Sequence, residues 1–195
     1  MLWVILGVFA VIALWAISVY NGLIAARNAF KNAFAQIEVQ LQRRYDLIPT
    51  LVENVKGYLQ FERETLERVI QARALAVSGL SAARANPGDP AAMQQLSGAE
   101  NMLTQALGRL FAVAEAYPDL KANQTVLALQ EELTSTENRI AFARQAYNDA
   151  VMNYNNRREM FPGNLVAGFF GFGPGALLEA ESPEARRAPR VSLIR

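Results

Sequence analysis

The chain begins with one pattern of hydrophobic positions and continues with another. Ser18 is the only clearly polar residue between Leu2 and Tyr20, and no charged residue occurs before Arg27. About 20 apolar residues in a helix span the hydrocarbon core of a bilayer. Eleven residues of this stretch are Leu, Ile, Val or Phe, and their insertion favours the bilayer by about 3–7 kcal/mol. The pattern predicts a transmembrane anchor over residues 1–26, with residues 2–24 in contact with lipid.

A cleaved signal peptide is the alternative interpretation of this stretch. Such a peptide needs a positive segment before a shorter apolar core, and small residues at the cleavage site. Here no Lys or Arg precedes the core, which favours the anchor. Arg27, Lys31, Arg43 and Arg44 all follow it. The positive-inside rule then predicts an external N-terminus and a cytoplasmic body.

Beyond residue 26 the apolar residues recur at intervals of three and four, which indicates amphipathic helices. Pro49 lacks a backbone donor, so we expect the first helix to kink or restart there. Gly, Ser, Asn and Pro residues predict a loop over residues 78–90, and Asp89 with Pro90 is a typical start for the next helix. The stripe positions on either side of Pro49 are Phe30, Phe34, Ile37, Leu41, Tyr45, Ile48, Val52, Val55, Leu59, Leu66 and Val69.

Two further helices follow. The first has its apolar residues between Met93 and Tyr117, and Pro118 is expected to end it; the second is predicted over residues 125–161. No stretch of strand length alternates with a period of two. The predicted fold class is all-α, with the transmembrane helix followed by an antiparallel bundle of long helices over residues 27–162.

The composition changes again after Pro162. Residues 163–178 are rich in Phe and Gly and include Phe169, Phe170 and Phe172. This segment is too short to span a membrane. It either caps the bundle or contacts a membrane surface or a partner. Residues 179–195 are rich in Glu, Ala, Pro and Arg and are predicted to be a disordered tail.

Composition limits the chemistry that the chain can perform. It has no Cys and no His, and its net charge is +1. The first absence excludes thiolate chemistry, and the second excludes His-based triads and His-containing metal sites. The near-neutral charge gives no reason to expect nucleic acid as a partner. We therefore expect no catalytic residues, no metal and no cofactor.

An all-carboxylate metal site remains as the enzymatic alternative. It would need carboxylates that converge inside the bundle. We expect instead that the candidates lie on solvated helix faces. They are Glu62, Glu64, Glu115, Glu131, Glu132 and Glu137.

Two groups of residues are candidate sites. Arg43, Arg44, Tyr45 and Asp46 precede Pro49, where an Arg–Asp pair would satisfy groups released by the proline; the alternative is an anion or partner site. Ser18, Gly22 and Ala26 form a stripe of small residues at helical spacing. Such stripes let helices approach closely in lipid, so this one suggests a homo-oligomer.

These residues also resemble a known family. The run QLQRRYDLIPTLVENVKGY over residues 40–58 is similar to the signature of the LemA family. Further matches are EAYPDLKAN over residues 115–123, Glu137-Asn138-Arg139-Ile140-Ala141, Tyr147-Asn148 and Tyr154-Asn155. The resemblance implies a single-pass protein of the bacterial plasma membrane with an external N-terminus and a helical bundle. Some relatives are linked to membrane proteases and envelope stress, and no catalytic residues are established.

The sequence as a whole predicts a non-enzymatic, membrane-anchored scaffold or adaptor in the bacterial envelope. We expect it to self-assemble and to present its bundle to membrane or protein partners. An adaptor for a membrane protease or an envelope-stress system is the alternative. A carboxylate-based metalloenzyme is the least favoured hypothesis.

Overall fold

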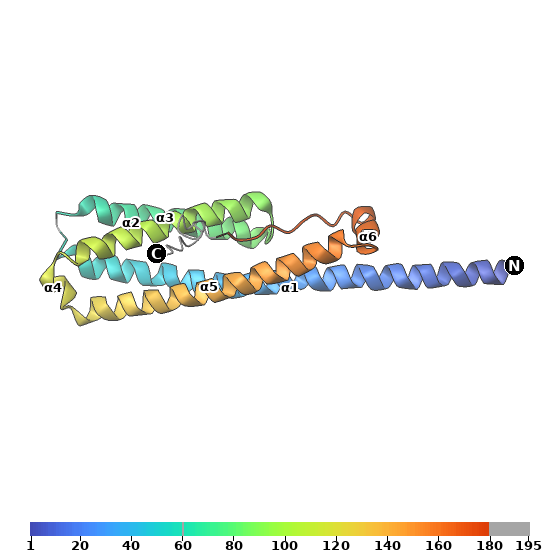
Figure 1. Cartoon of the computed structure of the whole chain (residues 1–195). Helices are drawn as coiled ribbons and strands as arrows, with labels where there is room; N and C mark the ends of the chain where they lie inside the picture. Colours follow the sequence, from blue (N-terminus) through green and yellow to red (C-terminus); the bar gives the residue numbers. More distant parts are fainter. Residues whose placement is uncertain (60, 180–195) are drawn as a thin grey trace, which may run out of the picture.

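The computed structural model describes residues 1–59 and 61–179, and the regular elements in this part of the chain are all helices (Figure 1). This confirms the predicted all-α fold class. Of the predicted disordered tail, residues 180–195 lie outside the described residues. The helices are α1 (Leu2–Lys56), α2 (Arg63–Ala85), α3 (Pro90–Ala114), α4 (Pro118–Lys121), α5 (Gln124–Glu159) and α6 (Gly163–Phe169).

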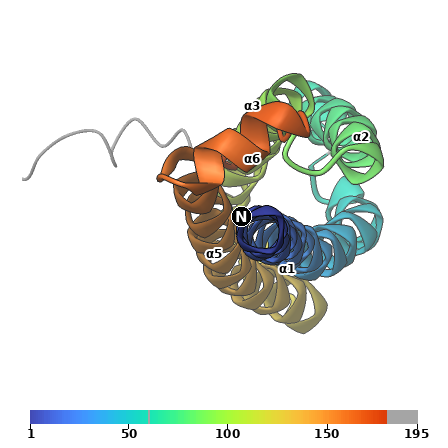
Figure 2. The same cartoon turned by 90° about the vertical axis from the view of Figure 1, so that its right-hand side faces the viewer.

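Four of these helices form an up-down-up-down bundle (Figures 1 and 2). α1 packs mainly against α5, and α2 packs mainly against α3. The two pairs lie side by side, and the N-terminal part of α1 projects far beyond the bundle (Figure 1). The buried stripes of the four helices meet in one hydrophobic core. Side chains such as Ile37, Leu96 and Val151 are fully buried there, and each stabilises the bundle by about 1.5–3 kcal/mol.

Of the two alternatives expected at Pro49, a kink or a restart, the restart is wrong, because α1 continues through the proline to Lys56. Proline has no N–H to donate to the carbonyl four residues earlier, which here belongs to Tyr45. Arg73 of α2 supplies the missing donor: its Nε lies 2.7 Å from the Tyr45 carbonyl oxygen. The neighbouring helix therefore satisfies the group that the proline leaves unpaired.

The predicted loop over residues 78–90 is also wrong in its first part. α2 continues to Ala85, so the turn contains only residues 86–89. Gly79 has a packing role inside α2, because a Cβ there would lie 3.1 Å from the Cα of Leu96 on α3. The predicted start of the next helix is confirmed: the Asp89 side chain accepts a hydrogen bond from the Ala92 N–H at 2.9 Å.

The ends of the two later helices differ slightly from the prediction. α3 ends at Ala114, and Pro118 begins the short helix α4 instead of ending α3. Proline is well suited to a first helical position, where no N–H is needed. α5 ends at Glu159, two residues before the predicted end.

Candidate functional site

The first third of α1 is apolar and has no partner within the described residues. No side chain from Leu2 to Ser18 is buried, and the first buried residue is Leu23. α1 is the candidate membrane span in the described part of the chain, by length and composition. None of its most apolar window is buried, so this window does not belong to the core of the bundle, although the later part of α1 does. An uncovered apolar surface of this size indicates an interaction with lipid or protein.

The predicted contact segment divides into two parts with different surroundings. Phe172 is 8% exposed and packs edge-on against Tyr20. Phe169 and Phe170 lie at the end of α6 and are 85% and 55% exposed. Residues 163–178 therefore cover the end of the bundle with Phe172, leave Phe170 partly covered and leave Phe169 open.

Gly163 allows the chain to turn back over the end of α5. A Cβ at this position would lie 2.1 Å from the carbonyl oxygen of Arg157, closer than any side chain can approach. Val166 and Ala167 then bury the inner face of α6. The cap depends on this close approach of two backbones.

After α6, residues 173–178 form a strap that runs beside α5. Tyr147-Asn148 and Tyr154-Asn155 hold it, and these two pairs are seven residues apart. Seven helical residues advance about 10.5 Å and three extended residues about 10 Å, so the spacings match. The Tyr147 hydroxyl donates to the Ala176 carbonyl oxygen and the Tyr154 hydroxyl to that of Gly173, both at 2.7 Å. Each Asn side chain forms two bonds with one strap residue: its amide NH₂ donates to the backbone oxygen and its amide oxygen accepts from the backbone N–H. Asn148 binds Leu178 in this way and Asn155 binds Gly175, at 2.8–3.2 Å.

Arg44 and Tyr45 form the centre of a polar network inside the bundle. Arg44 is 3% exposed. Its Nη1 lies 3.1 Å from Glu100 Oε2 on α3 and 2.9 Å from Glu137 Oε2 on α5, and its Nη2 donates to Thr104 Oγ1 at 2.9 Å. The Tyr45 hydroxyl donates to the other Glu100 oxygen. Two adjacent residues of α1 thus connect it to α3 and α5.

The network keeps one carboxyl group in a largely dry environment. Burial raises the pKa of Glu100 above its usual value, although the nearby Arg44 guanidinium acts in the opposite direction. Burial also raises the pKa of the Tyr45 hydroxyl, and the Glu100 carboxylate raises it further. Tyr45 therefore remains a neutral hydrogen-bond donor at physiological pH.

Arg43 and Asp46, the other two members of the predicted cluster, face outward. Arg43 donates to Glu132 Oε1 through Nη2 at 2.7 Å, and Asp46 accepts from Gln42 at 2.9 Å. The predicted Arg–Asp pair is therefore wrong. The arginine that serves the carbonyl released by Pro49 comes from α2, and local sequence spacing could not identify it.

The small residues at the membrane exit have different neighbours from those expected. Ala26 is buried in the core of its own bundle. A Cβ on Gly22 would lie 3.9 Å from Nη1 of Arg157 on α5. Ser18 is exposed. Ala26 therefore packs within the chain and is not available as an oligomer surface, whereas Ser18 is open.

The carboxylates do not converge as a metal site would require. Within residues 1–59 and 61–179, no three Asp or Glu side chains form a group suited to a metal ion. Glu100 and Glu137 both contact the same atom, Nη1 of Arg44, so the guanidinium occupies the position between the two carboxylates. Sequence reasoning placed Glu132 and Glu137 on solvated faces and did not single out Glu100, although all three bind arginine.

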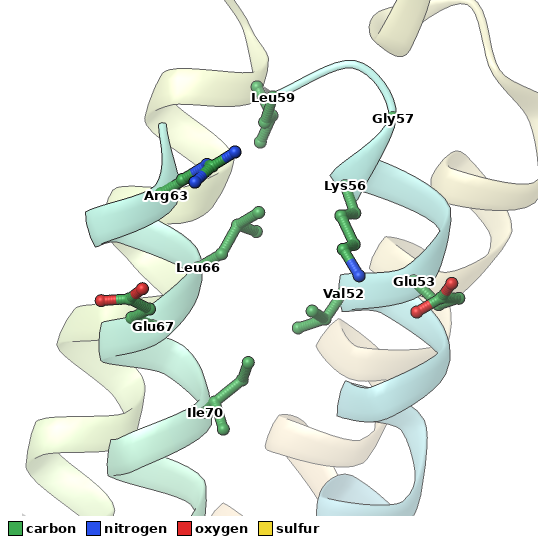
Figure 3. A pocket seen from close by; sticks show the side chains of 9 residues that line it. All are labelled: Val52, Glu53, Lys56, Gly57, Leu59, Arg63, Leu66, Glu67 and Ile70. Carbon is green, nitrogen blue, oxygen red and sulfur yellow. The ribbon is translucent and has the colours of Figure 1, made fainter. Parts of the chain in front are cut away.

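At the end of the bundle farthest from residue 2, α1 and α2 border an open groove of about 800 Å³. Figure 3 shows Val52 and Leu66 pointing toward one another across it, with the Lys56 side chain running along α1 beside it. Its lining combines apolar and charged side chains: Val52, Glu53, Lys56, Gly57, Leu59, Arg63, Leu66, Glu67 and Ile70. A groove of this kind is suited to an amphipathic segment.

Comparison with known proteins identifies the family of the chain. It is 28% identical over 171 residues to magnetosome protein MamQ 2 of Paramagnetospirillum magneticum, a match that covers 78% of this chain and 62% of the relative. It is 26% identical over 147 residues to protein LemA of Metamycoplasma hominis, covering 75% and 63%. The chain thus spans slightly less than two thirds of the length of these curated relatives. The LemA family model matches residues 33–193, and the chain therefore belongs to the LemA family.

Proposed function

We propose that this protein is a non-enzymatic, membrane-anchored scaffold or adaptor that presents its helical bundle to partners beside a bacterial membrane. The observation that carries the proposal is the continuity of α1. The same helix is apolar and uncovered up to Ser18 and packed into the bundle from Leu23 onward. A rigid connection between an anchor and a folded body is what such a scaffold needs.

The bacterial plasma membrane is the proposed location, with the residue 2 end outside and the bundle in the cytoplasm. Arg27 and Lys31 follow the apolar stretch closely, and no charged residue precedes them. Positive residues beside a span favour the cytoplasmic side.

The non-enzymatic part of the proposal is supported by the way the polar interior is used. Arg44 forms ion pairs with both Glu100 and Glu137, and the Tyr45 hydroxyl donates to Glu100. Such mutual pairing stabilises buried charges, and it leaves these groups engaged with one another. Their arrangement is that of a structural connection between helices.

Self-assembly is proposed to occur through the exposed part of α1 within the membrane. Ala26 is buried in the chain's own bundle and Gly22 is half-buried, so the surface most available to a second copy lies before them, over residues 2–18. The mass of the intact complex, extracted in mild detergent, tests this part. A mass of one chain would contradict self-assembly and would leave the anchoring proposal standing.

The adaptor role, including service to a membrane protease or an envelope-stress system, is favoured by the groove between α1 and α2 (Figure 3). It lies at the end of the bundle away from the anchor, where a partner could reach it without contacting lipid. Replacing Ile70, which lines the groove and is 52% exposed, with Glu should reduce recovery of membrane partners in a pull-down, while Ser81→Cys on an exposed part of α2 should not.

Cysteine labelling tests the anchor and its orientation. The chain has no Cys, so Leu2→Cys and Ala116→Cys each introduce a single reactive position, both at exposed residues. In intact spheroplasts an impermeant maleimide should label the first variant, and it should label the second only after lysis. Recovery of soluble chains that lack about the first two dozen residues would refute the anchor.

A further inference from the structure

The cap helix α6 lies at the level where the apolar part of α1 ends. From Leu2 to Tyr20, α1 advances about 27 Å at 1.5 Å per residue, which is close to the 30 Å or so of a bilayer's hydrocarbon core. The ring centroid of Phe170 lies 4.8 Å from that of Tyr20, and that of Phe172 lies 5.5 Å from it. If the anchor spans the bilayer, α6 lies beside its boundary.

The orientation of α6 suits that position. Figure 2 looks along α1 from its N-terminal end and shows α6 in the foreground, extending across the end of the bundle from α5 toward α3. Its axis therefore runs across the direction of α1. A helix placed in this way lies in the plane of a membrane that α1 crosses.

The two faces of α6 differ in a way that packing within the chain does not explain. Val166 and Ala167 are buried against the bundle. Leu165 and Phe169, four residues apart, are exposed by 60% and 85%, and Phe170, which follows the helix beside Tyr20, is exposed by 55%. Aromatic and aliphatic side chains on one side of a short helix are typical of segments that rest in the membrane interface.

Basic side chains follow just beyond the level of Tyr20 along α1. The Arg157 Nη1 atom lies 3.9 Å from where a Cβ on Gly22 would be, and Gly22 is about 3 Å beyond Tyr20 along the helix. This distance falls within the headgroup layer, which is about 5–7 Å thick on each side of the hydrocarbon core.

Arg27 extends the basic region, with its guanidinium 5.4 Å from the centre of the Phe172 ring. The Nε atoms of Arg27 and Arg158 are buried and lack a hydrogen-bond partner among the described residues. Arg158 also forms an ion pair with Glu159 at 2.5 Å. The hollow beside Arg27 adds one further residue of each sign, Lys31 and Asp89. Positive charge therefore exceeds negative charge among these residues.

We propose that α6 is a second membrane contact: Leu165, Phe169 and Phe170 enter the interface of the bilayer that holds α1, and Arg27 and Arg157 bind the phosphates of anionic lipids beneath them. This inference rests on the proposed membrane anchoring of α1. Two contacts fix the tilt of the bundle, which a single helix crossing the bilayer would leave free. The bundle is thereby held upright, with its groove directed away from the lipid.

Depth-dependent quenching of tryptophan fluorescence tests the proposal in the full chain. Trp3 and Trp15 are first replaced with Phe, and a single Trp is then introduced by Phe169→Trp. The protein is reconstituted in vesicles of phosphatidylcholine and phosphatidylglycerol that contain lipids brominated near the headgroup or near the chain end. We expect a blue-shifted emission and the stronger loss of fluorescence with the shallow bromines.

Phe61→Trp in the same background is the matched control, because Phe61 is 93% exposed at the opposite end of the bundle. It should show water-exposed emission and no quenching. If Phe169→Trp behaves like this control, the membrane contact of α6 is refuted. A chain that retains only Trp15 separates the two proposals: its quenching shows that α1 is in the bilayer even if α6 is not.

The lipid charge tests the role of the arginines. Quenching of Phe169→Trp should be weaker in vesicles of phosphatidylcholine alone, and Arg27→Gln combined with Arg157→Gln should remove this difference between the two vesicle types. Added inorganic phosphate should not reproduce the effect of phosphatidylglycerol. Equal quenching in both vesicle types before the arginines are replaced would refute the binding of anionic headgroups.

Discussion

The two parts of α1 belong to one unbroken helix, yet their apolar side chains differ in burial. Up to Ser18 these side chains point outward in every direction and none is buried; from Leu23 onward one face is buried against α5 and α2. The second part also contains a proline and a buried arginine, and the first part has neither. The unpaired carbonyl beside the proline and the buried guanidinium therefore occur where neighbouring helices can supply hydrogen-bond and ion-pair partners.

This difference has a physical basis in what surrounds each part. In lipid every backbone group must be satisfied within the helix itself, because no solvent can replace a missing bond. In the bundle, Arg73 can donate to the carbonyl that Pro49 leaves unpaired. The comparison can be tested by changes that should affect one part of α1 and not the other.

The largest effect is expected from a cavity in the packed part. Ile37 is fully buried, and Ile37→Ala should lower the free energy of unfolding by about 2–5 kcal/mol. Urea unfolding in detergent, followed by circular dichroism, measures the loss. Val39→Ala, two residues away at a side chain that is 60% exposed, should change stability by less than about 0.5 kcal/mol. Membrane retention should be unchanged in both variants.

A charge in the uncovered part should have the complementary effect. Val11→Arg replaces a residue that favours insertion with one that opposes it by about 2.5–3.5 kcal/mol. The fraction of the chain that resists carbonate extraction should fall, while urea unfolding of the bundle stays the same. Val11→Leu is the control. Undiminished retention of Val11→Arg would mean that lipid does not hold this part of α1.

A double-mutant cycle addresses the proline in the packed part. Arg73→Met leaves the Tyr45 carbonyl without its donor and should cost about 1–3 kcal/mol of stability. In a Pro49→Ala background the backbone N–H returns, so the same change should cost less. Equal costs in the two backgrounds would show that Arg73 does not compensate for the proline.

The smallest effect concerns the buried charge and depends on pH. Because burial raises the pKa of Glu100 in the folded chain above its unfolded value, the folded state binds the proton more tightly. The stability of the wild type relative to Glu100→Gln is thus highest below the unfolded pKa and decreases as the pH rises toward the raised pKa. Urea unfolding of both proteins between about pH 4 and pH 8 measures this difference. A difference that grows with pH in favour of the wild type would contradict the assignment.

Features set by local chemistry could be predicted from the sequence. An uncharged apolar run gave the candidate span, periodic apolar residues gave the bundle, and Asp89 with Pro90 gave the start of α3. Gly79 shows where this reasoning fails: glycine is typical of loops, but here it allows close contact between two helices. That contact depends on Leu96, seventeen positions away.

The polar network and the strap depend on long-range contacts of the same kind. Glu100 lies among small and polar residues, and its local sequence does not distinguish it from a surface carboxylate. Its burial follows from the position of Arg44 on another helix. The seven-residue spacing of Tyr147-Asn148 and Tyr154-Asn155 was visible as a family pattern, but its purpose requires the strap that these pairs bind.

The pairing of α1 with α5 also determines the order of assembly during synthesis. α1 leaves the ribosome before the other helices described, but the helix that covers most of its buried face begins only at Gln124. The α2–α3 hairpin can form meanwhile, because its helices are joined by a short turn. The fold is therefore complete only after α5 and the strap have been synthesised. Until then the apolar face of α1 is uncovered and prone to aggregation.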